Sequence, residues 1–193
     1  LSSSRCEYEN FTNASNLHYQ IVCNGLDTPK LYNGTVWADT AITGVTQSDL
    51  VQPCVYNGRI WFTRINSLVP VYLDIGAIAG PAHEFPIGNF AGMGGYLQRI
   101  ATWSVDTRQT VNDYLAFITS RGQVIVYVGT DPSDADAWQL VGVYNIGRPL
   151  GRRCSLKVAG DLAIICVDGV SSMNEALIAD RSTGKRQSIT QRI

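Results

Sequence analysis

Short apolar runs recur along almost the whole chain, and each run is closed by Gly, Asn, Asp or Pro. The runs are rich in Val, Ile, Tyr, Thr and Trp, which are typical of strands, whereas helical periodicity is nearly absent. This pattern predicts an all-β protein with one helical segment at residues 171–181. Strands are expected at residues 18–23, 29–32, 35–38, 51–56, 59–64, 71–73, 96–104, 113–119, 123–129, 138–144, 155–159 and 161–167.

Several of the turns between these runs have the composition of tight hairpins. Asn-Gly pairs adopt positive φ readily and favour two-residue type I′ turns. Such a turn at 33–34 would pair residues 31–32 with residues 35–37, and the pair at 57–58 repeats the device. Hairpin tips are therefore expected at Asn33-Gly34, Asn57-Gly58, Gly122 and Gly160.

Grouping the strands four at a time gives units of roughly 40 to 50 residues, the size of a propeller blade. We therefore predict a β-propeller-like domain of about four blades over residues 18–193, after a polar leader at residues 1–17. Closed propellers use roughly four to eight blades, so the chain is expected to be part of a larger propeller. A β-sandwich is the alternative, since evenly spaced short strands suit both folds. Repeated Trp and Tyr at strand ends favour the propeller.

The composition limits which classes of partner and which cellular compartment we expect for this protein. The 15 basic and 16 acidic residues give a net charge of -1, so charge alone would not hold a polyanion or an acidic membrane. No long apolar run and no secretory signal is present in the sequence, so we expect a soluble protein without membrane insertion. The five cysteines, expected to be buried free thiols because no Cys-x-x-Cys pair occurs, are Cys6, Cys23, Cys54, Cys154 and Cys166.

A catalytic constellation is not visible in the sequence. His18 precedes a strand, and His83 lies beside Glu84 in a loop rich in Pro and Gly, where a solvated side chain is the commoner role. The Gly-rich run at 92–95 lacks the Lys and Ser or Thr of a phosphate-binding loop. We therefore expect no catalytic residue, no cofactor and no small-molecule substrate.

Asp131, Asp134 and Asp136 lie between two apolar runs and could be taken for a metal site. Their spacing does not fit a calcium loop, which needs oxygens at its first, third and fifth positions and a later Glu. The sequence Asp-Pro-Ser-Asp fits a turn in which the carboxylates accept backbone hydrogen bonds. We predict a strand-connecting turn and no metal.

Two segments are candidate subunit interfaces. The apolar side chains of the long loop at residues 73–90 must be buried against something, and Arg is favoured at protein interfaces. The candidate interface residues are Ile75, Ile78, Phe85, Ile87, Phe90, Arg148, Arg152 and Arg153.

Three stretches also carry a resemblance to a known family: GGYLQRIATWSVD at 94–106, residues 113–154, and GDLAIICVDGVSSM at 160–173. They resemble virion proteins of tailed bacteriophages that are commonly labelled tail, tail-tube or head-tail stabilisation proteins. The earlier segments at 24–37, 56–62 and 73–80 are similar to the same family in the same order. The spacing over 129–138 and 147–154 is the most specific part.

The resemblance implies a propeller-like structural protein, similar to the tail nozzle of short-tailed phages. Copies of the chain would form a ring around the DNA exit channel, in contact with portal, adaptor or other tail proteins and in passing contact with DNA. The protein would be made in the bacterial cytoplasm and located in the virion tail. Members of that family are longer than this chain, which also implies part of a larger propeller.

The alternative function is a carbohydrate-binding or glycan-cleaving propeller for receptor recognition, since 4 Trp and 9 Tyr could stack on sugars. Trp103 and Trp138 are the residues to change in a test of that alternative. Cleavage would also need two carboxylates about 5 to 10 Å apart, for which the candidates are Asp106, Asp113 and Asp131. Most of the aromatics lie inside expected strands, which favours a role in the core.

Overall fold

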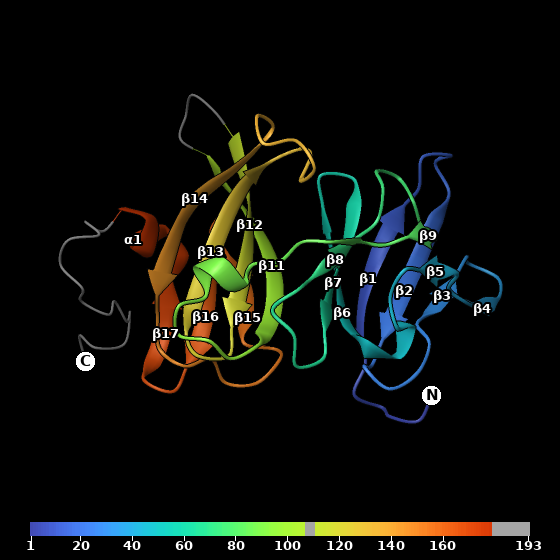
Figure 1. Ribbon diagram of the computed structural model, residues 1–193, viewed down its shortest axis with the longest axis horizontal. Helices are drawn as coiled ribbons and strands as arrows, with labels where there is room; N and C mark the ends of the chain where they lie inside the picture. Colours follow the sequence, from blue (N-terminus) through green and yellow to red (C-terminus); the bar gives the residue numbers. More distant parts are fainter. Residues whose placement is uncertain (107–110, 179–193) are drawn as a thin grey trace. The chain divides into compact units, whose positions relative to one another are not determined.

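The computed structural model in Figure 1 describes residues 1–106 and 111–178, and these residues confirm the all-β class. Apart from short 3₁₀ turns, the described chain has one helix, α1 (Met173–Ile178). The strands are β1 (Glu7–Thr12), β2 (His18–Cys23), β3 (Lys30–Tyr32), β4 (Trp37–Asp39), β5 (Ile42–Thr43), β6 (Leu50–Tyr56), β7 (Arg59–Arg64), β8 (Val71–Tyr72), β9 (Gly80–Pro81), β10 (His83–Glu84), β11 (Leu97–Asp106), β12 (Val111–Thr119), β13 (Gln123–Gly129), β14 (Trp138–Asn145), β15 (Ser155–Val158), β16 (Asp161–Cys166) and β17 (Gly169–Ser172).

The strands form four antiparallel sheets. The first sheet has the order β1-β2-β3-β4, and the second has the order β10-β8-β7-β6. The third has the order β11-β12-β13-β14, and the fourth has the order β15-β16-β17. A short parallel pair, β5 with β9, is separate from these sheets. The first, third and fourth sheets are thus meanders of sequential strands, whereas in the second sheet the chain passes through β9 between β8 and β10.

The chain divides into two compact units, Leu1–Gly88 and Asn89–Ile193. In the first unit, the inward side chains of the first and second sheets share one core, which also includes Ile42. The alternation of side chains along each strand explains which residues enter it. These are Phe11, Ile21, Cys23, Leu50, Ile60, Phe62, Val71 and Leu73.

The second unit repeats this arrangement with the third and fourth sheets. Aliphatic side chains of β12 and β13 pack with Leu162, Ile164 and Cys166 of β16. The burial of β12 and β13 is continuous through residues 115–119 and 123–127, so both faces of the third sheet are covered there. A sheet covered on both faces reads as an unbroken apolar run, which is why these strands were easy to find in the sequence.

The segment expected to be a polar leader at residues 1–17 instead contains an edge strand. β1 pairs with β2 from Glu7 opposite Cys23 to Thr12 opposite His18, and Phe11 enters the core with 6% of its surface exposed. This strand could not be recognised from the hydrophobic pattern, because only Phe11 among its core-facing positions is apolar. All six residues of β1 pair with β2.

Three of the four hairpin tips predicted from the sequence are confirmed. Asn57 and Gly58 have φ of 44° and 72°, and Ala159 and Gly160 have φ of 47° and 79°, as type I′ turns require. Gly122, with φ of 88°, lies at the β12–β13 turn as expected.

The prediction of a two-residue turn at Asn33-Gly34 is wrong. Tyr32 lies opposite Trp37, so four residues form the loop. The Asn33 side chain accepts hydrogen bonds from the backbone N–H groups of Thr35 and Val36, at 3.0 and 2.9 Å. This Asx turn competes with the type I′ turn and lengthens the loop.

The helix expected at 171–181 is shorter at its start because Gly169–Ser172 forms β17. The Ser172 hydroxyl accepts a hydrogen bond from the Glu175 N–H at 3.1 Å, which caps the first turn of α1. Residues 179–181 lie outside the described residues. Within residues 1–106 and 111–178, no helix is long and apolar enough to cross a membrane.

Gly129 provides a stability test of the third sheet. Its φ is 142°, and an added Cβ would lie 2.1 Å from the Ala137 carbonyl oxygen. Gly129→Ala should therefore lower the free energy of unfolding by about 3 kcal/mol, from backbone strain and steric overlap. Urea unfolding measures the change. Gly92→Ala is the control, because its Cβ would enter open space, and an equal loss in both variants would contradict the argument.

Candidate functional site

The outward face of the first sheet carries two rows of side chains that cross all four strands. Directly opposed residues in an antiparallel sheet point to the same face, so the strand registers define both rows. One row is Tyr8, Val22, Lys30 and Asp39, and the other is Asn10, Gln20, Tyr32 and Trp37. Thr12 and His18 continue the face beyond the second row. We call these ten residues the aromatic–polar face.

Two aromatic rings meet at the centre of the second row. The Tyr32 and Trp37 ring centroids are 5.0 Å apart with an interplanar angle of 30°. The Tyr32 hydroxyl donates to the Gly34 carbonyl at 2.8 Å, which ties the ring to the loop. Trp37 is 54% exposed, whereas Trp61, Trp103 and Trp138 are at most 8% exposed. Trp37 therefore offers an indole surface to solvent.

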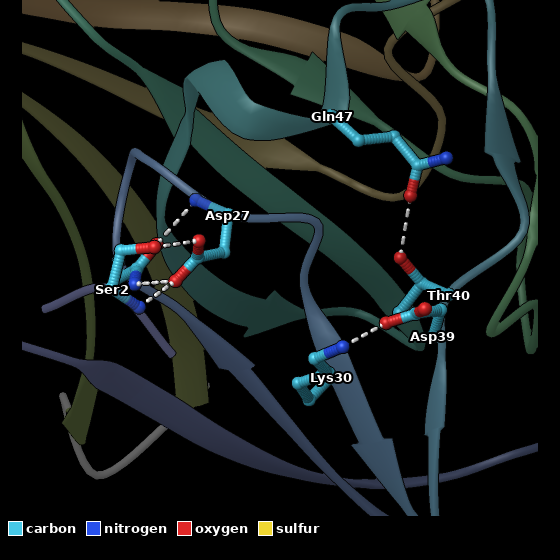
Figure 2. A network of polar contacts seen from close by, with 7 residues as sticks. Ser2, Asp27, Lys30, Asp39, Thr40 and Gln47 are labelled. Atoms are coloured by element: carbon cyan, nitrogen blue, oxygen red, sulfur yellow. Dashed lines mark hydrogen bonds and ion pairs between the residues drawn. The ribbon is translucent and has the colours of Figure 1, made fainter.

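Polar side chains around this pair are held in place by one another. Lys30 donates to the Asp39 carboxylate across β3 and β4, as Figure 2 shows. The Gln20 amide donates to Asn10 Oδ1 at 3.3 Å, and Thr12 Oγ1 lies 2.9 Å from His18 Nδ1. The face thus combines an aromatic surface with oriented amide, hydroxyl and imidazole groups.

The aromatic–polar face is hollowed next to each ring. A hollow of about 430 Å³ adjoins Trp37 and is lined by Leu1, Val22, Lys30, Ala38 and Asp39. Another of about 380 Å³ adjoins Tyr32 and is lined by Asn10, Phe11, Thr12, His18, Tyr19, Gln20 and Gly34. Volumes of this size lie within the range of small-molecule sites.

A carboxylate at the turn after β2 fastens the start of the chain beside this face. Asp27 accepts hydrogen bonds from the Ser2 N–H at 2.5 Å, the Ser2 hydroxyl at 2.6 Å and the Asn24 amide at 2.8 Å (Figure 2). These bonds, from Ser2 first and Asn24 second, lower the Asp27 pKa from 3.8 to about 2. Asp27 therefore stays charged and is a structural anchor. It cannot serve as a general acid near neutral pH.

The fourth sheet presents an exposed face of a different kind. Its outward side carries two aliphatic cross-strand pairs, Leu156 with Ala163 and Ile165 with Val170. Asp161 and Ser172 lie on the same side, and the Ser172 hydroxyl donates to the Asp161 carboxylate. Leu156 is 61% exposed and Ile165 is 43% exposed. We call this set the aliphatic face: Leu156, Val158, Ala163, Ile165 and Val170, with Val167 in the turn that follows β16.

Most apolar side chains of the loop at residues 73–90, which was expected to form a subunit interface, pack against residues of the unit to which they belong. Ile87 is fully buried, so it is not available to another subunit. Ile78 is partly buried against the first core, and Phe85 makes an edge contact with Trp61 at 5.7 Å between centroids. Phe90 makes a similar contact with Tyr127 at 6.3 Å.

Ile75 fits the interface prediction best within this loop, because 65% of its surface is exposed. Arg148 and Arg153 are also exposed and Arg152 is half-buried. The Arg148 carbonyl accepts from the Val167 N–H at 2.9 Å. The Arg152 carbonyl accepts from the Arg99 side chain at 2.9 Å. The three arginines stay candidate interface residues, and Ile75, on the other unit, is a separate candidate.

The three aspartates between β13 and β14 behave as turn residues, as expected. Asp131 accepts from the Ser133 N–H at 3.0 Å and from its hydroxyl at 2.7 Å. Asp134 accepts from the Asp136 N–H at 2.9 Å. In the part of the chain that the structure describes, no three His, Cys, Asp or Glu side chains are grouped to hold a metal ion.

The side chains weighed for catalysis contact other residues nearby. His83 Nε2 is 3.1 Å from Asp74 Oδ1, and Glu84 accepts from Arg64 at 2.7 Å. Asp113 accepts from the Ser104 hydroxyl at 2.5 Å on the third sheet. The side chain of Asp106 lies outside the described residues.

The tryptophans first considered for sugar stacking are core residues. Trp103 is 2% exposed and donates to Asn174 at 3.0 Å, and Trp138 is 8% exposed and stacks on Tyr127 at 5.6 Å. Neither can stack on an external ligand. The exposed Trp37 was missed because its position in a short expected strand gave no indication of which face it occupies.

The cysteines are free, and Cys23, Cys54, Cys154 and Cys166 are buried, as expected, while Cys6 is half-buried. Burial raises the pKa of Cys23, with a smaller contribution from Cys6. Burial also raises the pKa of Cys154 to about 11, against an opposing effect of Arg99. These thiols are therefore protonated at neutral pH and chemically inert.

No protein-family model and no curated protein matches this chain. The resemblance to phage tail proteins therefore stays a prediction.

The Asp27 anchor predicts a specific acid response. Because its pKa is lowered in the folded protein, its contribution to stability is present above about pH 4 and is lost as the pH falls to about 2. Asp27→Asn should flatten the fall of the urea midpoint between pH 4 and pH 2, while leaving the fold intact. Asp136→Asn, which removes an exposed carboxylate from another turn, is the control. Identical pH profiles for wild type and Asp27→Asn would contradict the assignment.

Proposed function

We propose that this protein is a structural subunit of a bacteriophage tail, which works by stacking β-sheets into a ring. The observation that carries the proposal is the aliphatic face of the fourth sheet. Single exposed apolar residues are common on soluble proteins, but a row of them on one sheet face marks an interaction surface. Leu156, Ile165 and Val167 are 61%, 43% and 65% exposed.

The meander topology supports a propeller-like arrangement over the sandwich alternative. A propeller blade is a four-stranded meander, whereas a sandwich links its two sheets by Greek-key connections. The first and third sheets contain four strands in chain order, and the fourth contains three. In this proposal each sheet is one blade, and the fourth sheet would lie next to a blade supplied from outside the described residues.

A second copy of this chain is the proposed occupant of the aliphatic face. The inward side of the same sheet already packs Leu162 and Ile164 against the third sheet, so covering its outward side would repeat an existing contact. Burying one further aliphatic side chain is worth about 1 to 2 kcal/mol. Several such residues together can hold a subunit contact, to which Arg148, Arg152 and Arg153 would add polar bonds.

The proposed role is mechanical and non-enzymatic. Rigid sheets would hold a joint around the DNA exit channel, while loops contact portal, adaptor or other tail proteins. The near-neutral net charge of -1 fits passing contact with DNA instead of retention. Buried free thiols fit synthesis in the reducing cytoplasm of the bacterial host before incorporation into the virion.

The location and the copy number test this function directly. Quantitative mass spectrometry of purified virions should find the chain in the tail, at a copy number that matches a symmetric ring. Its absence from virions, or a stoichiometry of one per particle, would contradict the proposal.

If copies of the chain assemble through the aliphatic face, one charge introduced into that face should prevent assembly. Ile165→Lys places an ammonium group in the proposed contact and should convert the assembled protein to a monomer, measured by sedimentation velocity. The monomer should keep its wild-type circular dichroism spectrum because Ile165 is 43% exposed. Leu26→Lys, at a turn residue that is 60% exposed, is the matched control and should still assemble. A wild-type protein that stays monomeric would contradict this mode of assembly.

A further inference from the structure

We propose that the aromatic–polar face of the first sheet binds a neutral oligosaccharide, with Trp37 and Tyr32 as the stacking surface. This binding site is independent of the proposed assembly, because it uses none of the residues of the aliphatic face. It also differs from the sugar-stacking residues expected from the sequence, since Trp103 and Trp138 are buried.

The stacking surface suits the apolar side of a sugar ring. The C–H groups of a pyranose carry partial positive charge and pack favourably on the electron-rich face of an aromatic ring. Trp37 presents 54% of its surface to solvent, and Tyr32 backs it at 5.0 Å between centroids. Because the Tyr32 hydroxyl is bonded to Gly34, the two rings are oriented before a ligand arrives.

The polar groups around the rings suit the hydroxyl groups of a sugar. Asn10 and Gln20 have amide donors and acceptors, and Lys30 and Asp39 provide an ammonium and a carboxylate on the same face. The hollows of about 430 and 380 Å³ adjoin Trp37 and Tyr32 respectively, which gives space for sugar units next to each ring. Four strands span about 14 Å, which accommodates a short oligosaccharide.

The charge of the face favours a neutral ligand. Lys30 is paired with Asp39, so its charge is compensated within the face. Single-stranded nucleic acid also stacks on aromatic rings, but it needs a basic groove along its phosphates. The other residues of the face are Tyr, Asn, Thr, His, Gln, Val and Trp, which supply no such groove. The amides and the ion pair also distinguish this face from the aliphatic face.

The exposure of Trp37 provides a local signal for binding. The other tryptophans are buried, so iodide should quench the fluorescence of Trp37 selectively. The full-length protein is first screened on an array of neutral oligosaccharides of glucose, galactose, mannose and N-acetylglucosamine. The best binder is then added during iodide quenching, and we expect it to protect Trp37. Calorimetry with the same oligosaccharide gives the affinity.

Two substitutions at one position separate stacking from simple hydrophobic contact. Trp37→Leu keeps an apolar side chain without an aromatic plane and should weaken binding by about tenfold or more. Trp37→Tyr keeps a ring and should retain measurable binding. Gln20→Ala should weaken binding by severalfold through loss of amide bonds. Tyr96→Ala, at an exposed aromatic outside the face, is the matched control and should bind as wild type.

Three results would overturn the inference. The first is no binding to any oligosaccharide of the array by folded wild-type protein. The second is Trp37-dependent binding of a single-stranded DNA oligonucleotide in place of sugars. The third is a wild-type self-association that Trp37→Leu abolishes, which would identify the face as a contact between copies. Since Ile165→Lys tests assembly separately, failure of either proposal leaves the other open to its own test.

Discussion

An antiparallel sheet with one apolar face is stable only when another layer covers that face, and each unit of this protein is built around one such contact. In the first unit, Ile21 of one sheet and Phe62 of the other lie in a common core. In the second unit, Val126 and Ile164 do the same. The positions of the candidate sites follow from which sheet faces are covered. The third sheet is buried on both sides along residues 115–119 and 123–127, whereas the first and fourth sheets each leave one face to solvent, and those faces hold the candidate sites.

The fold class and most strands could be predicted because covered strands leave a strong local signal. Runs such as residues 123–129 contain little but β-branched and aromatic residues, and Gly at a tip such as Gly160 marks the turn. β1 was not predicted, because Glu7 and Glu9 at its core-facing positions are polar and only Phe11 is apolar. The boundary between the two units, at Gly88, lies just before the Gly-rich run at 92–95, which was interpreted as a connection between strands and not as a boundary.

The candidate sites could be predicted from the sequence less well than the fold. The acidic turn was interpreted correctly because Asp131 and Asp134 bond to residues two positions away, which is a local pattern. The aromatic–polar face depends on which residues lie opposite one another on four different strands, and this register is not a local property. Ile87 illustrates the reverse error: an apolar residue in a long loop can be buried by its own chain.

The four-residue loop between β3 and β4 determines where Trp37 lies along the edge of the sheet. Because Asn33 holds an Asx turn, Trp37 is opposite Tyr32; a two-residue loop would have placed it opposite Lys30, still on the outward face. A one-residue shift of the β3–β4 register would instead place Trp37 opposite Leu31, on the core side. The β3–β4 register that this Asx turn accompanies therefore decides whether the indole is exposed: a shift of two residues would keep Trp37 on the outward face, whereas a shift of one would remove the exposed indole.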